Sequence, residues 1–183
     1  MRTLFIGRID PNKGPDIAAD SVYALQQEGL HLTFTVAGGL WFYGHGNEME
    51  DPYFRKLKEK MDNAHANYAG YVTRPDVPAV VRRHDVAFVL SRSNEPFGLV
   101  TLEAMASGCA VISSNRGGLP EACGGAAMLV DPDDLASVTA SLRILATDKV
   151  ALRDWKMKAV ERAGRASWST VGLVLAAALK ELL

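Results

Sequence analysis

Short, uninterrupted apolar runs separated by helical patterns constrain the fold of this chain more than any other feature. Five such runs each end in Gly, Ser, Asp or Pro, as strands do. The runs are apolar throughout rather than at alternate positions, which is typical of strands that are buried on both faces. Strands that alternate with helices indicate an α/β, Rossmann-like parallel sheet with helices on both faces. The expected strands cover residues 2–6, 32–37, 86–90, 110–113 and 128–130.

The segments between these runs carry the spacing and end signals of helices. Ala18, Val22 and Leu25 recur at helical spacing behind Pro15, a residue that suits a first helical turn. Asp51 is expected to cap a charged helix that begins with a proline at position 52. The expected helices cover residues 15–28, 52–64, 99–107, 133–146, 150–167 and 169–183, and residues 38–50 and 115–125 are expected to be irregular. The last helix is expected to bear an apolar face made of Val171, Val174, Leu175, Ala178 and Leu182.

Composition argues against several classes of protein. With 183 residues, 48% of them hydrophobic, the chain is expected to form one domain, residues 1–183, that buries roughly 70% of its unfolded surface. A net charge of −1 gives no basic field, so we expect no nucleic-acid partner. The longest apolar run, residues 173–179, is far shorter than the ~20 residues of a membrane span, and we recognise no secretory leader. Cys109 and Cys123 lack metal-ligand spacing and are expected to be buried thiols in a reduced, cytoplasmic protein.

Residues 95–108 carry the strongest sign of chemistry. Pro96 and Gly98 do not fit a helix interior, so we expect Glu95 in a loop and a helix that ends at Gly108. Glu103 then lies just over one turn inside that helix. Free N–H groups and the helix dipole favour an anion at the helix start, between the two carboxylates. This arrangement suits the diphosphate of a nucleotide sugar.

A glycine-bounded loop follows the first expected strand and precedes a helix, as a phosphate loop would. It begins with Gly7 and Arg8 and ends with Lys13 and Gly14. It matches neither the Walker A loop nor the Gly-x-Gly-x-x-Gly dinucleotide turn. The loop therefore predicts a phosphate contact through two fixed cations.

These residues, with others between and after them, resemble the retaining family-4 glycosyltransferases of the GT-B fold. The elements follow the family's order: Gly7-Arg8 with Lys13-Gly14, Gly70-Tyr71-Val72, the glutamate pair of residues 95–108, Val111-Ile112, and residues 117–121. The match covers the C-terminal, donor-binding half of such an enzyme, which implies that an N-terminal acceptor-binding domain is missing here. The resemblance implies a domain that binds a nucleoside-diphosphate sugar. With the acceptor domain it would transfer the sugar, with retention, to an acceptor hydroxyl, and alone it is expected to be inactive.

The resemblance also assigns roles to individual residues. Arg8 and Lys13 are expected to clamp the donor diphosphate and to stabilise the leaving group, with no metal ion and no cofactor. Glu103 is expected to accept both ribose hydroxyls, and Glu95 to position the donor sugar rather than to attack it. The further substrate-binding residues that the resemblance implies are Gly7, Tyr71, Val72, Ser91, Phe97, Gly98, Leu99 and Val100.

Some alternatives stay open at the level of sequence. Glu121 either contacts the cleft or bonds backbone amides of its own turn, and the aromatic residues 41–43 either stack on a base or face a partner domain. The alternative functions are a non-catalytic nucleotide-binding regulatory module and a GT-B nucleotide-sugar epimerase or phosphorylase. A phosphorylase would need a lysine-bound pyridoxal cofactor, for which no lysine motif is present. The histidines are expected to be exposed or internally satisfied: His31, His45, His65 and His84.

Overall fold

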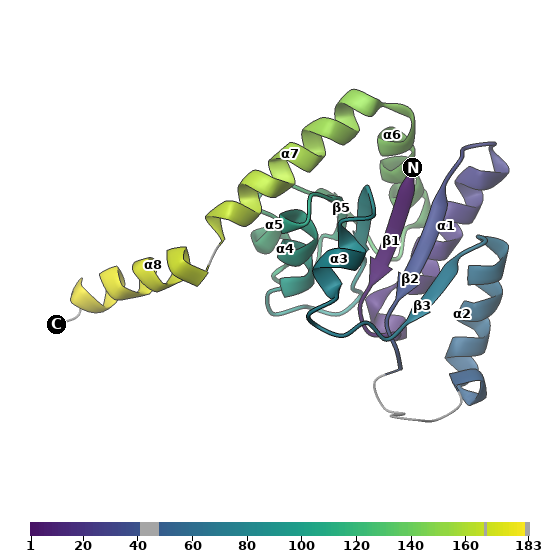
Figure 1. Ribbon diagram of the computed structural model, residues 1–183, viewed down its shortest axis with the longest axis horizontal. Coiled ribbons are helices and arrows are strands. Elements are labelled where there is room, and N and C mark those ends of the chain that lie inside the picture. The colour runs from purple at the N-terminus through teal and green to yellow at the C-terminus, as the bar shows by residue number, and fades with distance from the viewer. Residues whose placement is uncertain (41–47, 167, 182–183) are drawn as a thin grey trace.

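A six-stranded parallel sheet organises the chain (Figure 1). The computed structural model describes residues 1–40, 48–166 and 168–181. The strand order is β3-β2-β1-β4-β5-β6, and every neighbouring pair is parallel. The strands are β1 (Arg2–Ile6), β2 (Thr33–Ala37), β3 (Asn67–Gly70), β4 (Val86–Val89), β5 (Ala110–Ser114) and β6 (Met128–Val130).

Helices cover both faces of this sheet. One hydrophobic cluster packs α1 (Pro15–Gln27), α2 (Pro52–Asn63) and α6 (Leu135–Thr147) on the sheet. The other packs α3 (Val77–Val81), α4 (Leu99–Ala106), α5 (Leu119–Cys123) and α7 (Lys149–Arg165) on the opposite face. The α/β, Rossmann-like fold expected from the sequence is therefore confirmed.

The continuous apolar runs are explained by burial on both sides. In β1, Phe5 belongs to the cluster under α1, whereas Leu4 and Ile6 belong to the cluster under α4. Phe5 pairs in register with Phe88 of β4, and Phe34 of β2 meets Phe88 edge to face with ring centroids 6.1 Å apart. Because successive side chains of a strand point to opposite faces, apolar residues at consecutive positions fill both clusters.

Local capping sets the helix starts as the sequence indicates. Asp51 accepts a hydrogen bond from the Phe54 amide at 2.9 Å, and Pro52 is the first residue of α2. Pro15 likewise begins α1. Asp148 accepts hydrogen bonds from two amides of the first turn of α7. The two aspartate side chains satisfy amides that the helices themselves leave unpaired.

The structure corrects the sequence expectations in four places. It adds β3 and α3, which we did not predict, and it forms α5 inside the stretch 115–125 that we expected to be irregular. The cap of α4 is Ser107, so Gly108 lies one residue beyond it. Strand β3 lies at the sheet edge with partly exposed residues, so it needs no continuous apolar run. Helices α3 and α5 have five residues each, too few for a helical period to show.

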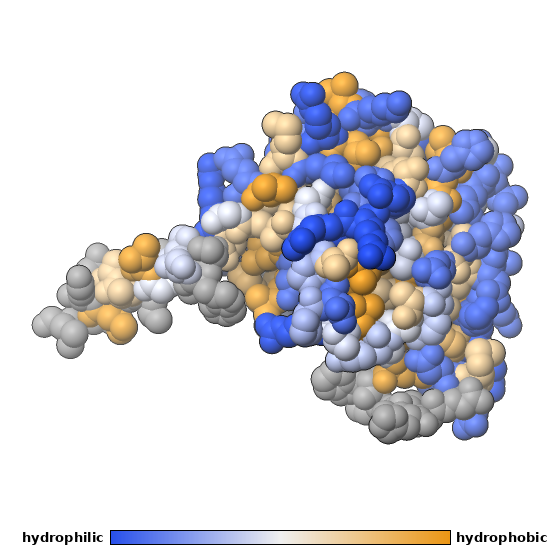
Figure 2. All heavy atoms as spheres, in the orientation of Figure 1, coloured by the Kyte–Doolittle hydropathy of each residue, from blue (hydrophilic) through white to orange (hydrophobic). Residues whose placement is uncertain are grey.

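The C-terminal helix α8 (Trp168–Glu181) extends away from the sheet (Figure 1). The side chains of its expected apolar face lie outside the described part of the molecule. Hydrophilic side chains gather over α2, at the right of the view in Figure 2. Among the helices within residues 1–40, 48–166 and 168–181, none combines the length and the hydropathy that crossing a bilayer requires.

Candidate functional site

The site lies where the strand order reverses. From β1 the chain moves outward to β2 and β3, and then returns to β4 on the other side of β1. Ligands of such sheets bind at the carboxyl ends of the strands that flank this switch point. Gly7 follows β1 there, and Ser91 follows β4 by two residues. Two adjoining pockets open at this edge and share Ile6, Gly7, Arg8 and Val100.

The first pocket, of about 410 Å³, is called here the diphosphate pocket, after the group its cations are predicted to bind. Its wall combines the ends of β1 and β4, the loop that carries Lys13 and the start of α4. The predicted site residues that line it are Gly7, Arg8, Lys13, Ser91, Glu95, Phe97, Gly98, Leu99 and Val100.

A lysine and a glutamate face each other in the diphosphate pocket. Lys13 Nζ and Glu95 Oε1 form an ion pair although the two residues are 82 positions apart. The buried Ser91 hydroxyl donates to the same Oε1 at 2.8 Å. Burial would raise the pKa of Glu95, but hydrogen bonds from Lys13 and Ser91 and the charges of Lys13 and Arg8 lower it below its ordinary value. Glu95 is therefore ionised at neutral pH and acts only as a hydrogen-bond acceptor.

Two glycines allow the backbone of Glu95 to sit where it does. The Gly118 amide donates to the Glu95 carbonyl at 2.7 Å. A Cβ at Gly118 would lie 2.3 Å from the Pro96 oxygen, and one at Gly117 would lie 2.6 Å from the Glu95 amide nitrogen. Any larger residue would push this loop aside, because the atoms it meets are backbone. The Gly-Gly pair therefore supports the loop that presents Glu95.

Arg8 stands at the junction of the two pockets. It lines both of them, and its Nε lies 3.3 Å from Oδ2 of Asp10. Asp10 also accepts a hydrogen bond from the Asn12 amide at 2.7 Å and so caps the 3-10 turn η1 (Pro11–Lys13). The same short turn thus orients both cations predicted from the sequence.

The second pocket, of about 610 Å³, is named the nucleoside pocket after the group that the sequence resemblance predicts beside Glu103. The predicted residues Tyr71, Val72 and Glu103 line it, together with Val100 at the shared wall. Glu103 is exposed, and no hydrogen bond or ion pair to its carboxylate occurs within the described ranges. Every predicted site residue therefore lines one or both pockets, whereas their roles stay predictions.

The sequence reasoning missed part of the nucleoside pocket. Gly39, Leu40, Glu48 and Val77 also line it. Glu48 belongs to the 3-10 turn η2 (Glu48–Glu50), and the Tyr68 hydroxyl lies 2.8 Å from each of its carboxylate oxygens. Gly39 and Leu40 follow β2 at the carboxyl edge, which is a signal that could have found them. Glu48 had no local signal, because only tertiary folding brings it there.

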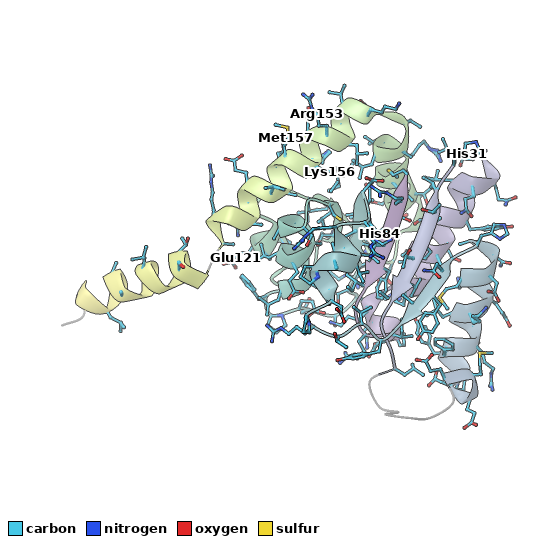
Figure 3. All side chains as sticks on the ribbon, viewed as in Figure 1. His31, His84, Glu121, Arg153, Lys156 and Met157 are labelled. Carbon is cyan, nitrogen blue, oxygen red and sulfur yellow. The ribbon has the colours of Figure 1, made fainter. Side chains whose placement is uncertain are left out.

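Other residues singled out in the sequence lie away from the pockets. Glu121 is exposed on α5 and lines neither pocket (Figure 3). His84 is satisfied as expected, since its ring nitrogens lie 2.9 Å from the Val80 carbonyl and 2.9 Å from the Thr35 hydroxyl. His31 and His65 are exposed. The aromatic residues 41–43 and His45 lie outside the described residues.

The cysteines and the acidic side chains offer no alternative centre. Cys109 and Cys123 are buried and unpaired with each other, and burial raises the pKa of the Cys109 thiol to about 11. No group of three His, Cys, Asp or Glu side chains in the described part of the chain is arranged to hold a metal ion. A wide depression of about 910 Å³ runs along α7 beside Arg153, Lys156 and Met157, but none of the predicted site residues lines it (Figure 3).

A family model described as glycosyl transferases group 1 matches residues 2–162. The chain belongs to this family.

Curated relatives agree with this assignment. The chain is 30% identical to glycogen synthase of Mycobacterium tuberculosis over 176 residues, which cover 94% of this chain and 41% of that protein. It is 33% identical to D-inositol 3-phosphate glycosyltransferase of Corynebacterium glutamicum over 178 residues, which cover 93% of this chain and 41% of that protein. It is 35% identical to mannosylfructose-phosphate synthase of Agrobacterium fabrum over 139 residues, which cover 72% of this chain and 29% of that protein. The chain spans less than half the length of these relatives.

Solved structures share the fold. Sucrose-phosphate synthase from Thermosynechococcus elongatus superposes with a TM-score of 0.78 at 22% identity, over 99% of this chain and 45% of that one. The C-terminal domain of a group 1 glycosyl transferase from Francisella tularensis superposes with a TM-score of 0.76 at 23% identity, over 90% of this chain and 85% of that one. The fold is therefore one half of a GT-B glycosyltransferase, as the sequence resemblance implied.

Proposed function

We propose that this chain is the donor-binding domain, residues 1–183, of a retaining glycosyltransferase of family 4. It binds a nucleoside-diphosphate sugar and, joined to an N-terminal acceptor-binding domain, transfers the sugar to an acceptor hydroxyl. The reaction needs neither a metal ion nor a cofactor, and the protein works in the cytoplasm. The single observation that carries the proposal is the pair of adjoining pockets, one lined by Glu95 and the other by Glu103, which share Arg8 between them.

The groups that line the two pockets suit the three parts of the proposed donor. The nucleoside pocket offers Glu103, whose carboxylate has no hydrogen-bond partner among the described residues and so can accept both hydroxyls of a ribose. Arg8 and Lys13 follow, where the diphosphate would lie next to the start of α4. Glu95 lines the same pocket as these cations, where an ionised carboxylate would accept hydrogen bonds from sugar hydroxyls. The three groups therefore suit the three parts of a nucleoside-diphosphate sugar.

The same groups support a mechanism in which the nucleoside diphosphate is the leaving group. Two cations stabilise the charge that grows on the departing diphosphate, so they act most strongly in the transition state. Glu95 is paired with Lys13 and hydrogen-bonded to Ser91, and its position therefore suits holding the sugar rather than attacking it. Retention then requires attack from the face that the diphosphate leaves, with the diphosphate accepting the proton of the acceptor hydroxyl.

Relatives and neighbours support the choice of donor. HepE from Anabaena, whose fold is similar with a TM-score of 0.78 at 20% identity, was crystallised in complex with UDP and glucose. Exposed apolar side chains border our pockets, including Tyr71, Phe97 and Leu99. An acceptor domain that packs over the cleft would cover them. The chain alone is then inactive, because it holds one of the two substrates.

A calorimetric titration tests the proposal. GDP, UDP and ADP, with and without an attached hexose, are titrated into the chain in the presence of a chelator. We expect at least one nucleoside diphosphate to bind, and its sugar to bind too. The proposal is wrong if none binds at millimolar concentration. Binding without transfer, after fusion to the acceptor domain of a group 1 relative, would favour the regulatory module instead.

A further inference from the structure

Arg92 joins three segments around the diphosphate pocket without lining either pocket. Its Nη1 and Nη2 donate to the two carboxylate oxygens of Asp16 at 2.8 and 2.9 Å. Its Nε donates to Asp133 at 2.8 Å, and Nη1 also donates to the Pro11 carbonyl. The guanidinium therefore links the loop after β4 to the start of α1, to η1 and to the loop after β6.

The backbone of Arg92 strengthens the same link. Its amide donates to the Asn12 carbonyl at 2.7 Å, and the neighbouring Ser91 hydroxyl lies 3.1 Å from that carbonyl. Pro11 and Asn12 are the two residues before Lys13, and Glu95 lies three residues after Arg92. The segment that carries the cation is thus tied to the segment that carries the carboxylate.

A second arginine holds Arg92 in place. Arg116 donates through Nη1 to the Arg92 carbonyl at 3.0 Å, and through Nη2 to Asp131 and Asp133 at 2.9 and 2.6 Å. Only a planar guanidinium with five donors can contact Asp16, Asp133 and a carbonyl together in this geometry. A lysine would contact one or two of them.

We propose that Arg92 is a positioning residue, which sets the approach of Lys13 to Glu95 and so shapes the diphosphate pocket. It holds the turn η1 against the loop after β4 and does not touch the ligand. The inference rests on the proposed function for what Lys13 binds, but the Lys13–Glu95 pair can be tested by a measurement that does not involve the nucleotide.

The simpler reading is that Arg92 only anchors α1 through Asp16. Arg143 provides the matched control, because it makes a similar two-oxygen ion pair with Glu28, at 3.0 and 2.8 Å, remote from both pockets. Arg92→Ala and Arg143→Ala both remove such a pair. If Arg92 had only this structural role, both substitutions would change thermal stability and neither would change the pKa of Glu95.

The first measurement needs no nucleotide. The titration of the Glu95 carboxyl carbon is followed by NMR, with Glu95→Gln used to assign its signal. In Arg92→Ala we expect the pKa of Glu95 to rise toward its ordinary value, because Lys13 no longer faces it closely. In Arg143→Ala we expect no change. An unchanged Glu95 titration in folded Arg92→Ala overturns the inference, whatever the nucleotide data show.

The second measurement tests whether Arg92 acts through Lys13. We expect Arg92→Ala to weaken binding of the nucleoside diphosphate about tenfold, and to weaken it less than twofold when Lys13→Met is already present. If Arg92→Ala weakens binding by the same factor with and without Lys13→Met, the inference is wrong. If the parent chain binds no nucleoside diphosphate, the proposed function fails, while the Glu95 titration still decides the role of Arg92.

Asp16→Asn covers the case in which Arg92→Ala does not fold. It keeps the size of the side chain but cannot accept both guanidinium hydrogen bonds. We expect it to raise the pKa of Glu95 in the same direction and by less. A folded Asp16→Asn whose Glu95 titrates as in the parent overturns the inference.

Discussion

The two ends of the cleft hold their glutamates in opposite ways. Glu95 is tied to Lys13 and Ser91, and its loop packs against Gly118. Glu103 is exposed on a helix, and its carboxylate makes no hydrogen bond or ion pair within the described ranges. A ligand at Glu103 therefore gains new bonds, whereas a ligand at Glu95 meets a carboxylate whose place is already set. Under the proposed function, the Glu103 end therefore suits affinity, and the Glu95 end suits alignment of the reacting sugar.

The largest expected effect is on sugar transfer through Glu95. Glu95→Gln keeps the shape of the side chain but removes the charge that Lys13 and the sugar hydroxyls face. In an enzyme completed by fusion to an acceptor domain, we expect transfer to fall roughly 10²–10³-fold. Affinity for the free nucleoside diphosphate should stay within a few-fold of the parent. Mass spectrometry that finds the sugar attached to Glu95 would show a nucleophile instead.

The next effect concerns nucleotide affinity through Glu103. Glu103→Ala removes a carboxylate that would accept two ribose hydroxyls, at a cost of about 1.5–3 kcal/mol in binding. Calorimetry should therefore show a loss of roughly tenfold to more than a hundredfold, with an unchanged melting temperature. Glu59→Ala, at an exposed helical position of α2, is the matched control and should bind as the parent does. Equal loss in both variants contradicts the ribose assignment.

A smaller effect, on the free energy of unfolding, tests whether close packing against Gly118 holds the loop that carries Glu95. Gly118→Ala places a Cβ 2.3 Å from the Pro96 oxygen, so the loop must shift at a cost of about 1–3 kcal/mol in unfolding free energy. Gly164→Ala, in α7 with no atom within 4 Å of the added Cβ, should instead stabilise by roughly 0.5–1 kcal/mol. Urea unfolding measures both. If Gly118→Ala is as stable as the parent, the close packing does not hold the Glu95 loop.

The smallest expected effect is that of a chelator. Arg8 and Lys13 supply the positive charge at the diphosphate pocket, so removal of divalent cations should leave donor binding unchanged in calorimetry. The completed enzyme should also transfer sugar in the presence of chelator. A strict need for magnesium or manganese at either step would contradict this prediction and would place a metal between the two ends of the cleft.

The fold was largely predictable from local signals. Strand β1 and its parallel neighbours appear as continuous apolar runs because both faces of the sheet are covered. The start of α4 was predictable from the Pro-Phe-Gly turn, and that of α2 from Asp51. Strand β3 escaped prediction because an edge strand with partly exposed residues lacks the continuous run.

The candidate site was likewise predictable where local signals act and unpredictable where tertiary contacts decide. The sequence by itself determined which residue types stand at the ends of β1 and β4, because glycines, prolines and charges act locally on turns and caps. The tertiary structure decided which of them meet. Lys13 reaches Glu95 across 82 positions because β1 and β4 are neighbours, and Arg92 ties their loops together. Glu48 lines the nucleoside pocket, where the Tyr68 hydroxyl donates to it from β3. Such contacts depend on strand order and register, which arise from packing of the whole sheet rather than from any local segment.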